Sequence, residues 1–344
     1  MLRKLISLMA CLLMVFVLCA SAEAAQRKIV MRIGAIPVPP QPQSMAAEEF
    51  KRIVESKVGD RLEVQVYHAL QLGSIAQHLQ GLQNGSIHAI FFPNGFFGPI
   101  VPEVMILDLN FFFPDNEWIF QMFNKGYMEP LQKAMEAKGL VFLSVPPAPE
   151  RGIFINQRVE NLSDFRGKRI RTYSSPISQQ TMAAMGFTPV NLDGSEMAVA
   201  VQQGTIDGVE TDITFWYSQK FFRANYRLDF YKGSIIHMST FSKRWFDTLP
   251  ADIQQAIREA ALEMPPIVHK YMHSTLIPNI LSDQEAKMNM VTLSDSVVNE
   301  LRSRVMPVHD VYKNMGPTFV ETYNYYKELI EKYPNPADAP PLNR

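Results

Sequence analysis

The chain has 344 residues, with 33 basic and 34 acidic side chains. This balance, with no basic block, argues against nucleic acid as a partner. The length allows two domains of about 150 residues each.

The N-terminal segment 1–24 is predicted to be a cleavable secretory signal peptide. Arg3 and Lys4 precede an apolar run, and the small residues of 20–24 offer two cleavage sites. A membrane anchor is the alternative, but the run is shorter than the roughly 20 apolar residues of a spanning helix. We therefore expect export to the periplasm.

Both cysteines, Cys11 and Cys19, lie within this segment. The exported chain is therefore expected to contain no disulfide, no thiol nucleophile and no cysteine metal site. An exported chain without cysteine is more typical of a bacterial periplasm than of a eukaryotic secreted fold.

The first half of the chain alternates predicted strands and helices. Strands are predicted at 28–36, 62–66, 87–92 and 140–145, the second from the alternation of Leu62, Val64 and Val66. Helices are predicted at 44–58, 75–84 and 117–138. Gly85 and Gly139 follow two of these helices, as is typical of helix C-terminal caps. This rhythm predicts an α/β fold with mixed or parallel sheets.

The second half repeats the rhythm and ends in helices. Strands are predicted at 152–156, 168–172, 188–192 and 206–210, helices at 175–185 and 196–203, and a strand at 232–240 that returns to the first lobe. The next helix, 250–264, is expected to break or kink at Pro265 and Pro266. Further helices are predicted at 267–290, 295–306 and 312–333, followed by a flexible tail at 334–344.

Two arginines lie next to predicted strands in this half, Arg151 before one strand and Arg171 at the end of another. A buried arginine needs an anionic partner, and a ligand carboxylate can be that partner where the chain supplies none. Two alternatives stay open. Arg171 can instead pair with Glu210 or Asp212, and Arg151 can be a solvated side chain.

Short motifs follow one another in a fixed order along the chain. They are Gln71-Leu72-Gly73, Pro102-Glu103, Asp164-Phe165-Arg166-Gly167-Lys168-Arg169-Ile170-Arg171, Gly186-Phe187-Thr188-Pro189, Ser195-Glu196, Gly204-Thr205-Ile206-Asp207-Gly208, Lys220-Phe221-Phe222 and Leu249-Pro250-Ala251. In this order they resemble the extracytoplasmic solute-binding protein of a tripartite ATP-independent periplasmic (TRAP) transporter, of the organic-acid-binding DctP type. The resemblance covers nearly all of the chain after the signal segment.

The resemblance implies an α/β, two-lobe periplasmic binding protein fold with mixed sheets, crossing strands and a long hinge-spanning helix. Residues 25–149 and about 233–275 would form lobe 1, and residues 150–232 and about 276–333 would form lobe 2. A ligand that bridges both lobes stabilises the closed state only. The implied partners are a small organic acid and the integral membrane TRAP permease subunits. A sensor that presents its ligand to a receptor is the alternative role.

The resemblance also implies a ligand site. Arg171 matches the family arginine that forms a bidentate salt bridge with the ligand carboxylate, and Arg151 matches a second arginine one strand earlier. The other candidate ligand-binding residues are Thr211, Glu210, Phe92, Asn94, Ser174 and Phe215. Phe92 and Phe215 are predicted cavity walls, Trp216 is either wall or core, and the other phenylalanines of 91–113 are mostly core.

Three departures from the family pattern concern the ligand. Thr211 stands where the family has asparagine, Gly194 stands where a bulky residue is usual, and the segment 92–97 is aromatic where polar residues are usual. These changes keep the carboxylate anchor. They favour a monocarboxylate or an aromatic acid, or an acid with a sizeable apolar part, over a C4-dicarboxylate or a sialic acid.

Enzyme signatures are weak in this sequence. Of seven histidines, only His269 and His273 have the i, i+4 spacing that could present two metal ligands on a helix, and Lys270 stands where a zinc hydrolase would have glutamate. Nucleophile-elbow and phosphate-loop motifs are absent from the sequence. We therefore expect no catalytic residue, no metal and no cofactor, with an exported α/β hydrolase as the less favoured alternative.

Overall fold

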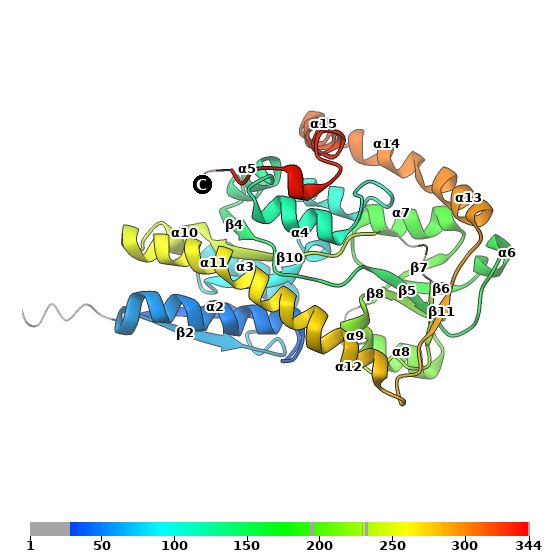
Figure 1. Ribbon diagram of the computed structural model, residues 1–344, viewed down its shortest axis with the longest axis horizontal. Coiled ribbons are helices and arrows are strands. Elements are labelled where there is room, and N and C mark those ends of the chain that lie inside the picture. The colour runs from blue at the N-terminus through cyan, green and yellow to red at the C-terminus, as the bar shows by residue number, and fades with distance from the viewer. Residues whose placement is uncertain (1–27, 193–195, 229, 231–232, 343–344) are drawn as a thin grey trace, which may run out of the picture.

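The computed structural model describes residues 28–342 except 193–195, 229 and 231–232. The predicted signal peptide and Gly194 therefore lie outside the described residues. Two mixed sheets form the centres of two lobes, as the resemblance implied (Figure 1). No helix within the described ranges has both the length and the apolar character needed to cross a membrane.

The sheet of lobe 1 has the strand order β2-β1-β3-β10-β4. Its strands are β1 (Ile29–Gly34), β2 (Leu62–Tyr67), β3 (Ala89–Pro93), β4 (Leu140–Ser144) and β10 (His237–Ser242). β1 is parallel to β2 and β3, whereas β10 is antiparallel to β3 and β4. β10 follows the strands β5 to β9 of lobe 2 in sequence, so the predicted return of the chain to lobe 1 is confirmed.

The sheet of lobe 2 has the order β11-β9-β5-β8-β6-β7. Its strands are β5 (Gly152–Ile155), β6 (Arg169–Thr172), β7 (Thr188–Asn191), β8 (Gly208–Thr211), β9 (Tyr226–Leu228) and β11 (Asn289–Val291). β5 and β6 both pair with β8, which brings the two arginine-bearing segments to one place. A Cβ on Gly208 would lie 2.3 Å from the carbonyl oxygen of Phe154, so this glycine serves close packing of β8 on β5.

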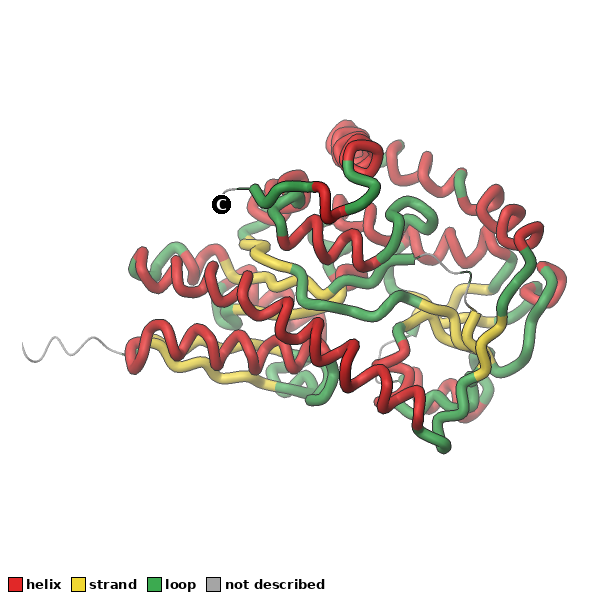
Figure 2. The backbone as a smooth tube through the Cα atoms, viewed as in Figure 1, coloured by secondary structure: helices red, strands yellow, loops and turns green. Residues whose placement is uncertain are grey.

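Helices cover both sheets (Figure 2). The helices of the first part of the chain are α2 (Pro42–Val58), α3 (Ile75–Asn84), α4 (Asn116–Asn124) and α5 (Glu129–Glu136), with the 3₁₀ turns η1 (Gly59–Arg61), η2 (Asn94–Phe96) and η3 (Pro102–Asp108). Those that follow are α6 (Leu162–Phe165), α7 (Pro176–Met185), α8 (Met197–Gln203), α9 (Ile213–Ser218), α10 (Lys243–Phe246), α11 (Ala251–Tyr271), α12 (Ile277–Ser282), α13 (Asp295–Val305), α14 (Pro307–Lys313) and α15 (Pro317–Lys332), with η5 (Pro336–Asp338).

The single helix predicted at 117–138 is wrong, because the chain forms α4 and α5 there. Gly126 adopts φ 113°, a conformation that ends the helical path, and Pro130 stands in the first turn of α5. Glycine accepts this backbone angle readily, and proline is compatible with the first turn of a helix.

The long helix α11 runs past the predicted break. Pro265 and Pro266 lie inside it, and the helix continues to Tyr271. Met264 and Val268 on either side are buried in the core. Packing of this apolar face therefore stabilises the helix although the two prolines cannot donate backbone hydrogen bonds. A π-helical segment, η4 (Met272–Leu276), then leads into α12, which packs against α9 of lobe 2. In Figure 1 this continuous rod crosses from lobe 1 to lobe 2.

The C-terminal helix α15 packs on lobe 1, whereas the predicted division placed residues 276–333 with lobe 2. Its Tyr326 and Leu329 belong to the hydrophobic core of lobe 1, and Tyr312 of α14 donates a hydrogen bond to the carbonyl of Glu103. In Figure 1 α15 lies above α4 and α5.

Residues 334–342 differ in the same way from the predicted flexible tail. Lys125 donates hydrogen bonds to the carbonyls of Pro336 and Ala339, and Tyr127 donates to the carbonyl of Pro340. The described part of the tail is therefore bound to the surface of lobe 1.

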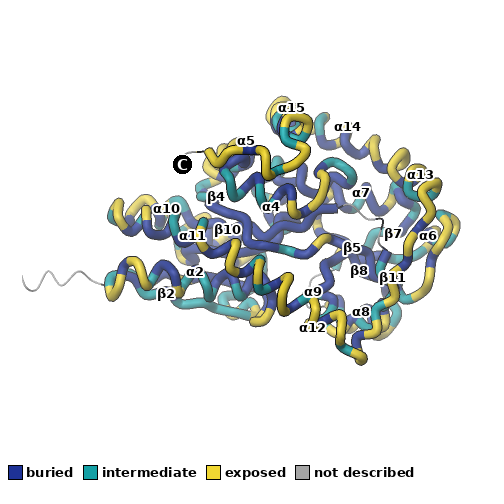
Figure 3. Tube along the Cα trace, in the orientation of Figure 1, coloured by how far each residue is buried: buried dark blue, intermediate teal, exposed yellow. Residues whose placement is uncertain are grey.

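Figure 3 shows that the central strands of both sheets are buried, and β3 and β10 in lobe 1 and β5 and β8 in lobe 2 are buried along their whole length. The aromatic run follows the prediction that it is mostly core. Phe91, Phe92, Phe97 and Phe113 are buried in the hydrophobic clusters of lobe 1.

Candidate functional site

A cavity of about 490 Å³ lies between the lobes, and both lobes line it. Its walls follow the carboxyl ends of strands: Ile36 comes after β1, Pro93 ends β3, Tyr173 comes after β6, and Thr211 ends β8. Open α/β sheets bind ligands at this edge. A volume of this size falls in the range of about 300–1,000 Å³ that is usual for small-molecule pockets.

Arg171 on β6 brings a positive charge to this cavity. The side chain is only 4% exposed, its Nε donates to the carbonyl of Leu192 at 3.2 Å, and its guanidinium lies 4.8 Å from the ring centre of Tyr173. Burial lowers the pKa of Arg171, while the neighbouring Tyr173 and Glu210 raise it. An arginine remains charged even when buried, so the cavity wall carries a cation.

The two carboxylates that were considered as partners for Arg171 are engaged elsewhere. Glu210 accepts hydrogen bonds from Arg151 at 3.2 Å and from Thr172 and Ser178 at 2.7 Å each. Asp212 caps α9 by accepting from two backbone N–H groups of that helix. Among the residues that the structure describes, Arg171 forms no ion pair with a carboxylate.

Arg151 lies one layer behind the cavity. Its side chain is fully buried, and it donates to Asp108 at 3.0 Å and to Glu210 at 3.2 Å. The alternative of a solvated arginine is therefore wrong. Burial raises the pKa of Asp108, and the adjacent Arg151 lowers it. Because Asp108 belongs to lobe 1 and Glu210 to lobe 2, this buried triad links the two lobes.

Tyr173 separates the two arginines. Its ring centre lies 5.0 Å from the guanidinium of Arg151 and 4.8 Å from that of Arg171. Burial raises the pKa of Tyr173 to about 12, so its hydroxyl is protonated at neutral pH and can donate a hydrogen bond. The ring also packs edge-on against Phe96 of lobe 1, with ring centres 5.7 Å apart.

Lobe 1 contributes a polar group and a contact with lobe 2. Gln43, in the first turn of α2, lines the cavity, and its buried Oε1 has no hydrogen-bond partner among the described residues. The adjacent Gln41 donates a hydrogen bond at 2.9 Å to the carbonyl of Thr214 in lobe 2. The lobes therefore touch next to a buried acceptor that has no partner among the described residues.

Three of the predicted ligand-binding residues line the cavity, namely Arg171, Thr211 and Phe215. Arg151 and Glu210 lie behind it in the buried triad. Phe92, Asn94 and Ser174 are outside the described lining, and Trp216 belongs to the core, where it stacks on Phe154. Phe92 is a fully buried core residue, Asn94 donates to Asp108 at 3.0 Å, and Ser174 is exposed.

Sequence reasoning missed Gln43, Phe96 and Tyr173. Tyr173 carried a usable signal, because it follows Arg171 by two residues and alternate residues of an extended segment point to one side. Phe96 belonged to the noted aromatic segment, in which Phe92 was preferred as a wall. Gln43 carried no signal, because its position depends on how α2 meets lobe 2.

Comparison with known proteins places the chain in a family. The family model described as bacterial extracellular solute-binding protein, family 7, matches residues 33–315. A solute-binding protein of Verminephrobacter eiseniae is 29% identical over 69% of this chain and 71% of its own length. The C4-dicarboxylate-binding periplasmic protein DctP of Rhodobacter capsulatus is 24% identical over 85% of this chain and 89% of its own length.

Solved structures show the same fold. A TRAP periplasmic solute binding protein from Sulfitobacter sp. NAS-14.1, with bound beta-D-galacturonate, has a TM-score of 0.80 at 21% identity and covers 87% of this chain and 99% of its own. Another, from Desulfovibrio salexigens with bound orotic acid, has a TM-score of 0.78 at 22% identity and covers 90% of this chain and 98% of its own. The chain therefore belongs to the bacterial extracellular solute-binding proteins of family 7, which confirms the resemblance to TRAP solute-binding proteins that its motifs carry.

Proposed function

We propose that this protein is the periplasmic component of a TRAP transporter, that it captures an organic acid through a salt bridge between Arg171 and the ligand carboxylate, and that it delivers the acid to a membrane permease. The proposal includes export by cleavage of residues 1–24. It also includes the absence of catalysis, so that the ligand leaves the protein unchanged.

One observation carries the proposal, namely that Arg171 lies at the cavity wall and forms no ion pair with a carboxylate in the part of the chain that the structure describes. A buried cation without an anionic partner is costly, and a carboxylate ligand offsets that cost. The planar guanidinium can hold a carboxylate with two parallel hydrogen bonds, which fixes its orientation as well as its charge. Glu210 and Asp212 accept hydrogen bonds from other groups, so neither of these two carboxylates takes the place of a ligand at Arg171.

The other walls indicate what kind of acid fits. Within the described lining, Arg171 is the sole cationic side chain, and Asp212 adds a carboxylate. A second ligand carboxylate would meet like charge rather than a partner. Leu70, Ile75 and Phe96 supply apolar surface from lobe 1. We therefore propose a monocarboxylate with an apolar or aromatic body, held at its polar end by Arg171.

The ligands of solved relatives agree with this anchor. Galacturonate and orotic acid, bound by the two relatives described above, each carry one carboxylate. They differ widely in their other parts, which fits a site where one salt bridge is constant and the walls vary. The R. capsulatus relative, named for C4-dicarboxylates, marks the competing ligand class.

Isothermal titration of the purified chain tests the ligand class. Aliphatic and aromatic monocarboxylates are compared with succinate and malate. Thermal melting is a second measurement, because a bound ligand stabilises the folded protein by RT ln(1 + [L]/Kd). We expect saturable binding of one or more monocarboxylates and none of the four-carbon diacids. Tight binding of succinate or malate would overturn the proposed ligand class while leaving the role of Arg171 to be tested by mutation.

Two further measurements separate the alternatives. Mass spectrometry of the ligand after prolonged incubation should recover it unchanged, whereas a hydrolysis product would indicate an enzyme. Uptake of the labelled acid in cells should require both this protein and two membrane permease subunits. A ligand response that survives loss of the permease would indicate a sensor.

A further inference from the structure

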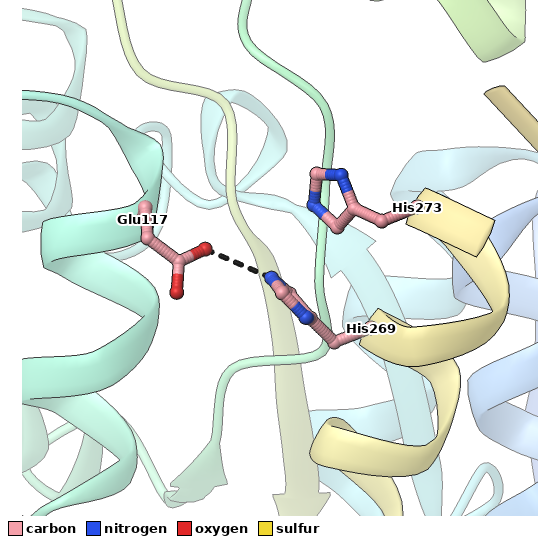
Figure 4. Close-up of side chains that lie close together, drawn as sticks. All are labelled: Glu117, His269 and His273. Atoms are coloured by element: carbon pink, nitrogen blue, oxygen red, sulfur yellow. Dashed lines mark hydrogen bonds and ion pairs between the residues drawn. The ribbon is translucent and has the colours of Figure 1, made fainter. Parts of the chain in front are cut away.

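A second cavity, of about 380 Å³, lies on the hinge and shares no described lining residue with the ligand cavity. Its walls come from α4, from the crossing segment 147–150 between the lobes, and from the rod formed by α11, η4 and α12. Glu117, His269 and His273 meet on this wall (Figure 4).

The three side chains form a compact group of potential metal ligands. Nε2 of His269 lies 2.8 Å from Oε2 of Glu117, and the ring centres of His269 and His273 are 4.4 Å apart. One ligand atom from each of the three residues falls within 4.8 Å of the others. Zinc holds nitrogen and oxygen ligands at about 2.0–2.1 Å, so ligand atoms of a tetrahedral site are about 3.3 Å apart. The group therefore needs to contract by about 1.5 Å at most, which side-chain rotation can provide.

The helices hold these side chains in place. His269 and His273 are four residues apart, which puts them on one face of the helix. His269 stacks on Phe120 of α4 with ring centres 4.6 Å apart and an angle of 18°. His273 lies in the π-helical segment that begins at Met272, and such segments are frequent at functional sites.

The chemistry of the group suits a cation as well. Two imidazole rings offer nitrogen ligands, and the carboxylate of Glu117 adds an oxygen ligand and a negative charge.

We propose that Glu117, His269 and His273 bind a divalent transition metal ion of the zinc class. Two imidazoles and one carboxylate are ligands that Zn²⁺ accepts in its tetrahedral sites, with the fourth position left to water. The bound ion would join α4 of lobe 1 to the rod that continues into lobe 2, next to the crossing segment. The sequence showed the histidine pair but predicted no metal, because Lys270 stands where a zinc hydrolase has glutamate. Glu117, which contacts His269, lies 152 positions earlier in the chain.

Zinc titration of the full exported chain tests this site, with a purification tag that contains no histidine. We expect one equivalent of Zn²⁺ to bind and to raise the melting temperature, and MgCl₂ to have no such effect because Mg²⁺ prefers oxygen ligands. His273→Ala and Glu117→Gln should each weaken Zn²⁺ binding at least about tenfold. Co²⁺ should give a tetrahedral absorption band with the wild type that is lost in His273→Ala.

His68→Ala is the matched control, because His68 also contacts a carboxylate, that of Glu48 at 2.7 Å. This variant should bind Zn²⁺ like the wild type. Circular dichroism establishes that each variant is folded, and His273 and Glu117 are exposed, so either variant can carry the test if the other is unstable. Absence of saturable Zn²⁺ uptake by the wild type would overturn the proposal. Equal uptake by the wild type, His273→Ala and Glu117→Gln would overturn it as well.

Discussion

Replacing Arg171 with alanine removes the cation that the proposed function assigns to the ligand. Because the side chain is only 4% exposed, water screens its interaction with a bound carboxylate very little. Removing one partner of a buried charged pair costs about 3–5 kcal/mol. Since each 1.4 kcal/mol is a factor of ten, ligand affinity should fall by about a hundredfold to a few thousandfold.

The same substitution should change the ligand-free protein very little. Arg171 hydrogen-bonds the carbonyl of Leu192 and the side chain of Tyr173, and each bond contributes about 1 kcal/mol. The variant also escapes the cost of burying a charge that has no carboxylate partner among the described residues. The two effects oppose each other. The melting temperature without ligand should therefore shift by only a few degrees.

Titration calorimetry with the identified ligand measures the loss of ligand affinity. Arg169 offers a matched control on the same strand. Arg169 pairs with Asp207 and its side chain is 43% exposed, so Arg169→Ala should leave affinity within about twofold of the wild type. Arg171→Lys keeps the positive charge but lacks the planar guanidinium, so its ligand affinity should lie between those of the wild type and Arg171→Ala. Affinity of Arg171→Ala within about fivefold of the wild type would refute the assignment, as the anchor would then lie elsewhere.

Three other predictions concern groups around the cavity and in lobe 1. Arg151→Ala leaves the carboxylates of Asp108 and Glu210 buried without their cation, so the free energy of unfolding in urea should fall by about 3–5 kcal/mol, and a loss under 1 kcal/mol would contradict the buried triad. Gln43→Leu removes a buried acceptor of the cavity lining that has no partner among the described residues, so titration should show ligand affinity lowered about five- to tenfold with unchanged stability of the free protein. Burial lowers the pKa of His88 to about 4, and a nearby arginine contributes a smaller lowering effect. As the pH falls below 6.5, this histidine is therefore protonated in the unfolded chain before it is protonated in the folded protein. The free energy of unfolding that the neutral His88 contributes is therefore lost between pH 6.5 and about 4, and about 2 kcal/mol of it is lost at pH 5. Urea unfolding at pH 7 and pH 5 measures this loss, and His88→Gln should reduce the difference between the two pH values by about that amount.

The elements that sequence reasoning predicted well are those with a local cause. Alternating apolar residues predicted the strand β2, and the cap at Gly85 lies where the helix α3 ends, with φ 85°. Arg171 was found because its motif ties it to the end of a strand. Such signals depend on a few neighbouring residues, so a single sequence carries them.

Features that depend on distant contacts could not be predicted in this way. The helix α11 survives two internal prolines because its flanking residues are buried against α2, and α15 reaches lobe 1 through Tyr326. Gln43 enters the cavity, and Glu117 reaches His269, only because the fold brings separate helices together. In each case the stabilising contact spans many tens of residues and leaves no local pattern.

Closure of the lobes over the ligand can be tested at Gly95. This residue has no positive φ, so alanine fits its backbone, but a Cβ there would lie 3.0 Å from ring atoms of Tyr173 across the lobe boundary. Overpacking of this kind costs about 1–3 kcal/mol, and it is felt only where the lobes meet. The lobes touch in the structure, which therefore represents the closed arrangement. If the lobes part when no ligand is bound, Gly95→Ala should lower ligand affinity about five- to 150-fold and leave the melting temperature of the ligand-free protein unchanged.

Gly98→Ala is the control for this prediction, because a Cβ at Gly98 would meet the flexible side chain of Met105 within lobe 1, at 3.3 Å. Its affinity should stay within about twofold of the wild type. Unchanged affinity of Gly95→Ala would show that Tyr173 does not need to approach Gly95 when the ligand binds. A lower melting temperature without ligand would show instead that the two residues are already in contact in the free protein. The pair of glycines thus distinguishes a protein that closes on its ligand from one in which the cavity is permanently formed, and only the first fits delivery by release to a permease.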